Sequence, residues 1–155
     1  MNGAPWGEKS LRRIYTLAYR FTGDSRLAAA LAEEVLVHLA GRGWTLEPWD
    51  RVRLLIYKEL SNLYLDKYGP PPAPNLVPND RAAVLQQALN VLSPEEKVAV
   101  ILRDVGRLSL DEVEAVLAWP RPKVGAALAR GRCKLCRFLT AGTGGGQLAG
   151  RIPPG

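Results

Sequence analysis

Residues 108–139 join an acidic stretch to a basic one, and this pair constrains the fold more than any other feature. Ser109 stands three residues before Glu112, which is the capping-box pattern that begins a helix. Pro120 ends that helix, because proline lacks the backbone N–H that a helix interior needs. Pro122 suits the first turn of another helix. We therefore expect a short acidic helix, a tight turn and a longer basic helix.

The second helix of this pair sorts into an apolar face and a cationic face. Apolar or small residues recur at spacings of three and four, as on one face of a helix: Val124, Leu128, Gly131, Leu135 and Phe138. The other face is small and basic: Lys123, Ala126, Ala127, Arg130, Lys134 and Arg137. This plan over 109–138 is typical of a helix-turn-helix DNA reader. The alternative is an ordinary solvated helix, although such helices usually mix both signs of charge.

The charge of the whole chain favours an acidic partner such as nucleic acid. The net charge is +6 and the isoelectric point is near 9.6. Residues 1–69 carry ten Lys/Arg against eight Asp/Glu. Most of the positive surplus therefore belongs to the second half, above all to its basic helix.

Several protein classes are disfavoured by what the chain lacks. Cys133, Cys136 and the single histidine, His38, are too few and too far apart in sequence for a metal site, so we expect none. The two cysteines stand three apart within one expected helix, where a disulfide would be strained. We therefore expect reduced thiols and no disulfide. No apolar run approaches the roughly 18–20 residues of a membrane span, and the N-terminus has no signal-peptide pattern. We expect a cytoplasmic protein without membrane partners. Without a recognisable catalytic set, we expect no enzyme activity, no cofactor and no small-molecule substrate.

Helical spacing of apolar residues also covers the rest of the chain. The first half predicts three helices, at about 8–21, at 25–40 after a cap at Asp24 or Ser25, and at about 49–68. Residues 70–79, PPPAPNLVPN, predict a semi-rigid proline-rich linker.

After the linker, we expect one helix from Asp80 to about Leu92 and another that begins with the capping box at Ser93. The glycine-rich tail at 140–155 is expected to be disordered. No stretch shows the alternation of a β-strand. The expected fold is all-α, with a three-helix bundle at 8–69 and a four-helix bundle at 80–139.

Three segments resemble the small two-domain sigma factors of the sigma-70 family, the extracytoplasmic-function type. The segments ALNVLSPEEKVAVILRDVGRLSLDEVEAVL and KVGAALARGRCKLCRFL resemble their domain 4, and LRRIYTLAYRFTGDSRLAAALAEEVLVHLA resembles their domain 2. The resemblance implies a sigma factor that directs core RNA polymerase to promoter DNA. It also admits an anti-sigma factor as a further partner.

The resemblance assigns roles to three sets of residues. The cations that would neutralise phosphates of the upstream promoter element are Arg121, Lys123, Arg130, Arg132, Lys134 and Arg137. The residues that would contact polymerase are Leu31, Glu33 and Glu34. Those that would contact the melted promoter strand are Asn62, Tyr64, Asp66 and Lys67. The family's base-capturing loop corresponds to the region of Trp44 and Trp49, where we instead favour packing of the bundle.

Two motifs depart from the family pattern. The family's Asp-Leu-Val-Gln-Glu docking motif is Ala30-Leu31-Ala32-Glu33-Glu34 here, and its Thr-Val-Lys-Ser-Arg is Lys123-Val124-Gly125-Ala126-Ala127. Glycine and alanine offer few groups that can read base edges, whereas attraction to phosphates remains. The alternative function is therefore a degenerate sigma-like regulator, which binds polymerase, another sigma factor or DNA without initiating transcription alone.

Overall fold

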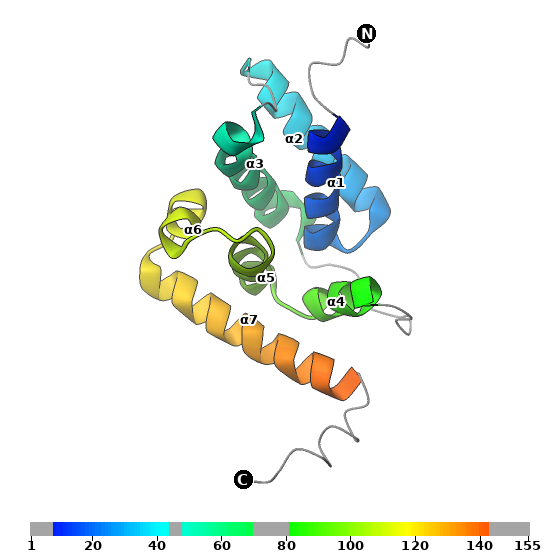
Figure 1. Ribbon diagram of the computed structural model, residues 1–155, viewed down its shortest axis with the longest axis vertical. Coiled ribbons are helices and arrows are strands. Elements are labelled where there is room, and N and C mark those ends of the chain that lie inside the picture. Colours follow the sequence, from blue (N-terminus) through cyan, green and yellow to red (C-terminus); the bar gives the residue numbers. More distant parts are fainter. Residues whose placement is uncertain (1–7, 44–47, 70–80, 143–155) are drawn as a thin grey trace.

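The computed structural model describes residues 8–43, 48–69 and 81–142, and every element within these ranges is a helix. Figure 1 shows two groups of helices, with α1, α2 and α3 in the upper part and α4 to α7 in the lower part. The all-α prediction is thereby confirmed. The proline-rich stretch 70–79, Trp44 and the tail beyond 142 lie outside the described residues.

The first group is a bundle around a largely apolar centre. Its elements are α1 (Glu8–Thr22), α2 (Ser25–Gly41), α3 (Trp49–Leu63) and the π turn η1 (Tyr64–Tyr68). Asp24 caps α2, because its carboxylate accepts the backbone N–H groups of Arg26 and Leu27 at 2.7 and 3.1 Å. The residues that fill the centre include Ile14, Phe21, Leu31, Val35, Ile56 and Leu60.

The second group contains the predicted helix-turn-helix. Its elements are α4 (Arg81–Asn90), α5 (Pro94–Val100), the π turn η2 (Ile101–Val105), α6 (Leu110–Leu117) and α7 (Arg121–Gly142). Ser93 and Ser109 each begin a helix with the reciprocal capping box that the sequence predicts. The last helix continues to Gly142, three residues beyond its expected end.

Gly131 lets α7 cross α5 at close range. A Cβ at this position would lie 2.7 Å from Val100 Cγ2 and 3.4 Å from the carbonyl oxygen of Glu96. Only a residue without a side chain fits so tight a crossing. In Figure 1 α7 accordingly runs as one long helix beneath α4, α5 and α6.

The two groups share one hydrophobic core. Helix α3 packs against α6, α1 packs against α4, and η1 packs against α5. Polar contacts join them at the rim: Arg53 Nη2 lies 3.0 Å from Glu112 Oε2, and Gln86 Nε2 donates to the carbonyl oxygen of Arg20 at 3.1 Å. In the part of the chain that the structure describes, no helix combines the length and the apolar character needed to cross a membrane.

Candidate nucleic-acid interface

A tight turn between α6 and α7 sets the helix-turn-helix geometry. Ala118 ends α6 in the left-handed conformation, with φ of 57°, and its N–H donates to the carbonyl oxygen of Glu114 at 2.7 Å. Val124 and Leu128 bury the inner side of α7. Lys123 Nζ lies 4.4 Å from the ring centroid of Trp119 in the turn. The first turns of α7 are thus held by buried residues on the inner side and by the contact of Lys123 with Trp119 on the outer side.

One residue that was predicted to lie on the outer face of α7 is buried. Ala127 is 1% exposed, so its assignment to the outward face was wrong. It follows Val124 by three positions and precedes Leu128 by one, which places it within the buried stripe. Gly125 and Ala126 remain exposed, as expected.

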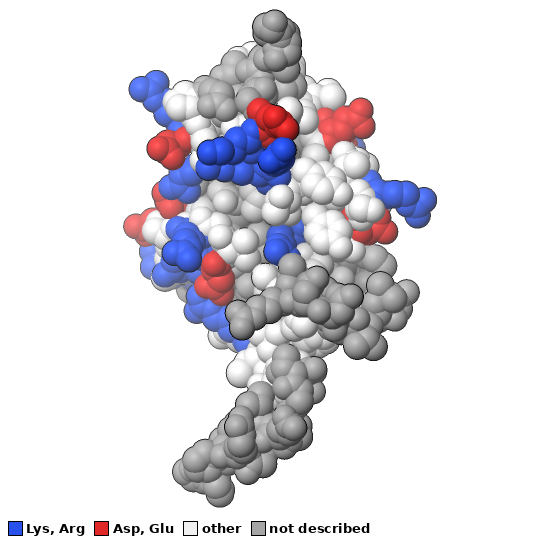
Figure 2. Space-filling model, turned by 45° about the vertical axis from the view of Figure 1, so that its right-hand side comes forward, with Lys and Arg blue, Asp and Glu red and all other residues white. Residues whose placement is uncertain are grey.

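All six predicted phosphate-binding cations are exposed on α7. Five of them nevertheless form ion pairs with acids of α5, η2 and α6, at up to 3.3 Å. The pairs are Arg121 with Asp111 and Glu114, Lys123 with Glu95, Arg130 and Lys134 with Glu96, and Arg132 with Asp104. Arg137 has no ion pair among the described residues. On the face of the molecule drawn in Figure 2, acidic side chains likewise lie beside basic ones.

Glu96 is the most deeply buried of these acids. Its side chain is 5% exposed and lies 3.3 Å from Arg130 Nε and 2.8 Å from Lys134 Nζ. Burial alone would raise the pKa of Glu96, but hydrogen bonds from Lys134 and from the backbone of Ser93 lower it below its ordinary value. The carboxylate therefore stays ionised and anchors the middle of α7 to α5.

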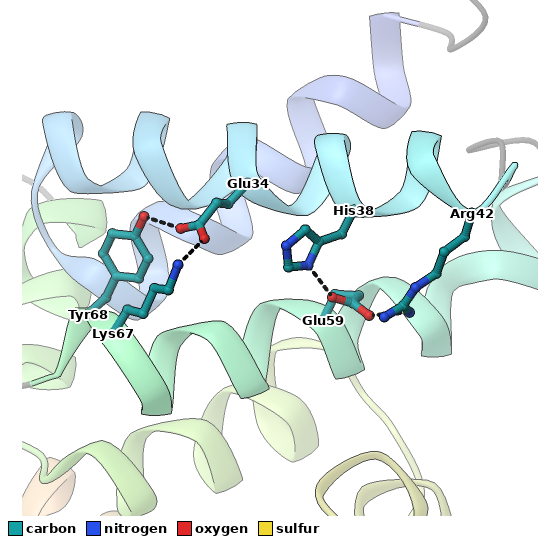
Figure 3. Close-up of polar contacts among 6 residues, drawn as sticks. All are labelled: Glu34, His38, Arg42, Glu59, Lys67 and Tyr68. Atoms are coloured by element: carbon teal, nitrogen blue, oxygen red, sulfur yellow. Dashed lines mark hydrogen bonds and ion pairs between the residues drawn. The ribbon is translucent and has the colours of Figure 1, made fainter.

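The residues predicted to contact polymerase do not share one surface. Leu31 is 0% exposed and lies in the bundle core, so it cannot contact another protein in this conformation. Its position four residues before Val35 places it on the buried stripe of α2. Glu33 is exposed. Glu34 is half-buried and accepts hydrogen bonds from Lys67 Nζ at 2.5 Å and Tyr68 OH at 2.7 Å (Figure 3).

The residues predicted to contact the melted strand are divided as well. Asn62, Asp66 and Lys67 are exposed, whereas Tyr64 is 0% exposed and cannot contact DNA in this arrangement. Its ring packs against Phe21, with centroids 5.4 Å apart.

The pairing of Lys67 with Glu34 brings together one residue from each of two predicted sites. The hydrogen bond from Lys67 is the main cause that lowers the pKa of Glu34. No short-range sequence pattern signals this contact, since the two residues are 33 positions apart.

A second polar network in Figure 3 ties α2 to α3. His38 Nδ1 lies 3.2 Å from Glu59 Oε1, and Arg42 Nη1 donates to Glu59 Oε2 at 2.7 Å. Among the described residues, no group of three or more His, Cys, Asp or Glu could hold a metal ion. Through its contact with Glu59, His38 joins α2 to α3.

The remaining side chains that the sequence singled out are one tryptophan and two cysteines. Trp49 packs against the core, and the Arg13 guanidinium lies 4.9 Å from its ring centroid, which confirms the packing role. Cys133 and Cys136 are free and exposed.

Comparisons with known proteins agree with this architecture. Residues 82–135, which span α4 to most of α7, match the family model of sigma-70 region 4. The chain is 29% identical over 153 residues to the ECF RNA polymerase sigma factor SigE of Mycolicibacterium smegmatis, covering 82% of this chain and 57% of that protein. The chain thus spans a little over half the length of this curated relative.

The fold also matches a solved structure, that of the sigma factor RpoE from Bartonella quintana in complex with the anti-sigma factor NepR. The TM-score is 0.66 at 15% identity, covering 85% of this chain and 92% of RpoE. The order of the helices, as seen in the RpoE match, points to sigma factors. The region 4 match and the similarity to SigE do the same. Residues 82–135 thus match sigma-70 region 4, and the chain as a whole is similar to sigma factors of the extracytoplasmic-function type.

Proposed function

We propose that the protein is a sigma factor that directs core RNA polymerase to promoters and binds the upstream promoter element through α6 and α7. One observation carries this proposal: the turn at Ala118 joins α6 to a helix α7 along which six cations are exposed beside the buried stripe. Such a helix fits the major groove while its basic side chains reach the phosphates.

Binding to DNA would proceed by exchange of ion pairs. Exposed ion pairs contribute little to stability, so phosphates can replace the acids that now hold Arg121, Lys123 and Arg132. Gly125 and Ala126 offer few groups to read bases. The helix would thus gain affinity mainly from the DNA backbone.

The first half would contact polymerase and the opened strand. Glu33 is the exposed acid of the docking segment, and Asn62, Asp66 and Lys67 are the exposed polar residues near the end of the third helix. Leu31 would act by holding α2 in place. We assign these roles to a domain at 8–69, and upstream binding to a domain at 80–139, joined by the linker at 70–79. An inhibitor of the anti-sigma type is a proposed further partner, in keeping with the RpoE–NepR complex.

Run-off transcription with purified core RNA polymerase and a promoter library tests the function. We expect transcripts from a subset of promoters, and loss of those transcripts when Lys123, Arg132 and Arg137 are replaced by alanine together. Replacing Arg26, Arg51 and Lys58 by alanine is the matched control, because these exposed cations lie away from α7. Polymerase binding without any initiation would contradict the proposal and would identify a degenerate regulator instead.

A further inference from the structure

A cleft between α1 and α3 has a basic rim and an apolar floor. It encloses about 360 Å³, which is the size of a small-molecule site. The rim consists of exposed polar side chains of α1, namely Lys9, Arg12, Arg13 and Thr16. The floor consists of Leu17, Trp49 and Tyr57.

The basic side chains of the rim have little compensating charge. Lys9 and Arg13 form no ion pair among the described residues, and the pair of Arg12 with Glu8 is 76% and 80% exposed. Lys9 and Arg13 stand four residues apart, where like charges destabilise a helix. None of the described residues that line the cleft is acidic. The rim is therefore suited to an anion from outside the chain, unlike α7, where most cations already pair with acids.

Trp49 holds the Arg13 guanidinium at the edge of the cleft. The Cζ atom of Arg13 lies 4.9 Å from the ring centroid of Trp49, which is a cation–π contact. A stacked guanidinium keeps its N–H groups available for a phosphate, which it can bind through two parallel hydrogen bonds. The Thr16 hydroxyl, three residues further along α1, has no hydrogen-bond partner in the described part of the chain. The rim thus offers several donors to one polyanion.

The floor of the cleft suits a planar ring. Leu17 is 7% exposed and Tyr57 is 6% exposed, while Trp49 is half-buried. An aromatic group that covers these side chains would remove apolar surface from water, whereas an inorganic anion would leave that surface wet. The cleft therefore fits a molecule that combines an aromatic ring with phosphates.

The cleft lies on a different side of α3 from the residue predicted to contact the melted strand. At about 100° per residue, Asn62 is turned by about 140° from Trp49 and by about 140° from Tyr57, in opposite senses. A strand that follows Asn62 therefore runs on the far side of α3 from the floor of the cleft.

We propose that this cleft binds a free nucleoside triphosphate, with the phosphates on the basic rim and the base against the floor. Several cations along one helix suit a chain of phosphates better than a single one. Because no acidic side chain lines the cleft to hold Mg²⁺ or to activate water, the nucleotide is a bound ligand and not a substrate. The site goes beyond the proposed function and belongs to the free protein.

Isothermal titration calorimetry of the free protein, at low salt and with EDTA, tests the ligand class. We expect ATP or GTP to bind without Mg²⁺, and both adenosine and inorganic triphosphate to bind at least tenfold more weakly, because each lacks one half of the ligand. Inorganic triphosphate that binds as tightly as the nucleotides would overturn the proposal, since the floor would then contribute nothing. Absence of binding by ATP and GTP at millimolar concentration would overturn it as well.

Paired substitutions test the rim. Lys9→Ala combined with Arg13→Ala should weaken nucleotide binding at least tenfold, because two charge-assisted contacts are lost. Arg26→Ala combined with Lys58→Ala is the matched control, since it removes the same charges at exposed positions of α2 and α3. We expect the control to bind nucleotide as the wild type does. An equal loss in both double variants would reduce the effect to net charge and would overturn the site.

A single-stranded oligonucleotide separates a free nucleotide from nucleic acid as the occupant. We expect the Lys9–Arg13 double variant to bind the oligonucleotide as tightly as the Arg26–Lys58 double variant. Weaker oligonucleotide binding by the Lys9–Arg13 variant alone would assign the cleft to nucleic acid and overturn the proposal. Nucleotide binding by a protein that does not initiate transcription would refute the sigma function and leave this site standing, and transcription without nucleotide binding would do the reverse.

Discussion

Gly131 of α7 lies so close to Val100 of α5 that a Cβ would come within 2.7 Å of Val100 Cγ2. Val100 is buried and β-branched, so it cannot move aside cheaply. We expect Gly131→Ala to lower the free energy of unfolding by about 1–3 kcal/mol, even though alanine is the better helix former.

Gly125 is the matched control for that substitution. It lies in the same helix, is exposed, and has no atom within 4 Å of an added Cβ. Gly125→Ala should therefore raise stability by about 0.5–1 kcal/mol. Urea unfolding of both variants measures the contrast, and stabilisation by both would show that the crossing of α5 and α7 is looser than the structure has it.

Ala118 carries the left-handed backbone of the turn, with φ of 57°. This conformation costs a residue with a Cβ about 1–2 kcal/mol, so Ala118→Gly should stabilise the protein by about 1 kcal/mol. The same exchange at the exposed helical Ala126 should cost about 0.5–1 kcal/mol. Thermal unfolding of the pair checks the sign, which must differ between the two sites if the turn is strained.

Lys97 should make stability depend on pH. Its pKa is lowered to about 7 in the folded protein from an ordinary 10.5, mainly by burial. Between these two values the unfolded chain binds the proton and the folded protein releases it, so stability rises with pH across this window. Below pH 7 both states are protonated and the destabilisation is fully present.

The measurement is urea unfolding at pH 7, 8 and 9. This range lies below the titration of Tyr64 and Tyr68, because burial raises the pKa of both, that of Tyr68 to about 12. We expect stability to rise by about 1–3 kcal/mol from pH 7 to pH 9. Lys97→Met should abolish most of the rise; an equal rise in this variant would assign it to other groups.

The acids that pair with Arg121 should weaken DNA binding. Replacing Asp111 by asparagine and Glu114 by glutamine frees this guanidinium for a phosphate. We expect tighter binding to duplex DNA in fluorescence anisotropy, by about 3- to 10-fold at low salt. Glu33→Gln, an exposed change on α2, is the control and should leave the affinity nearly unaltered. No gain in the double variant would mean that Arg121 does not face the DNA.

Arg137 provides the complementary test, because it has no ion pair among the described residues. Arg137→Ala should weaken duplex binding and reduce the slope of log affinity against log salt by about 0.9, as expected for one lost phosphate contact. A slope that equals that of the wild type would exclude this contact.

Local sequence signals predicted the helices well. Ser93 and Ser109 begin their helices as expected, because a capping box depends on residues three positions apart. The helix-turn-helix followed from the same kind of information. Spacing also predicted the burial of Val124, Leu128 and Gly131 in α7, whereas Leu135 and Phe138 are only partly buried. It placed Ala127 on the wrong face, because a small residue is compatible with either face.

The sites were predicted less well because their surroundings come from distant parts of the chain. Tyr64 is covered by α5 and Phe21, whereas the family pattern assigned it a contact with DNA. The acids that pair with α7 lie 7 to 38 positions earlier in the sequence, so a count of charges within the helix missed them. Leu31 was on an expected apolar face, and the family pattern alone suggested an outward role.

Two helices end in a π turn, closed by hydrogen bonds of 3.1 Å from Gly69 N–H to the Tyr64 carbonyl and 2.7 Å from Gly106 N–H to that of Ile101. A π turn holds one residue more than an α turn. Deletion of a single residue there could leave a continuous α-helix, while everything after it would rotate by about 100°. A one-residue deletion at either place is therefore expected to reorient the segment that follows, while the helix before it stays intact.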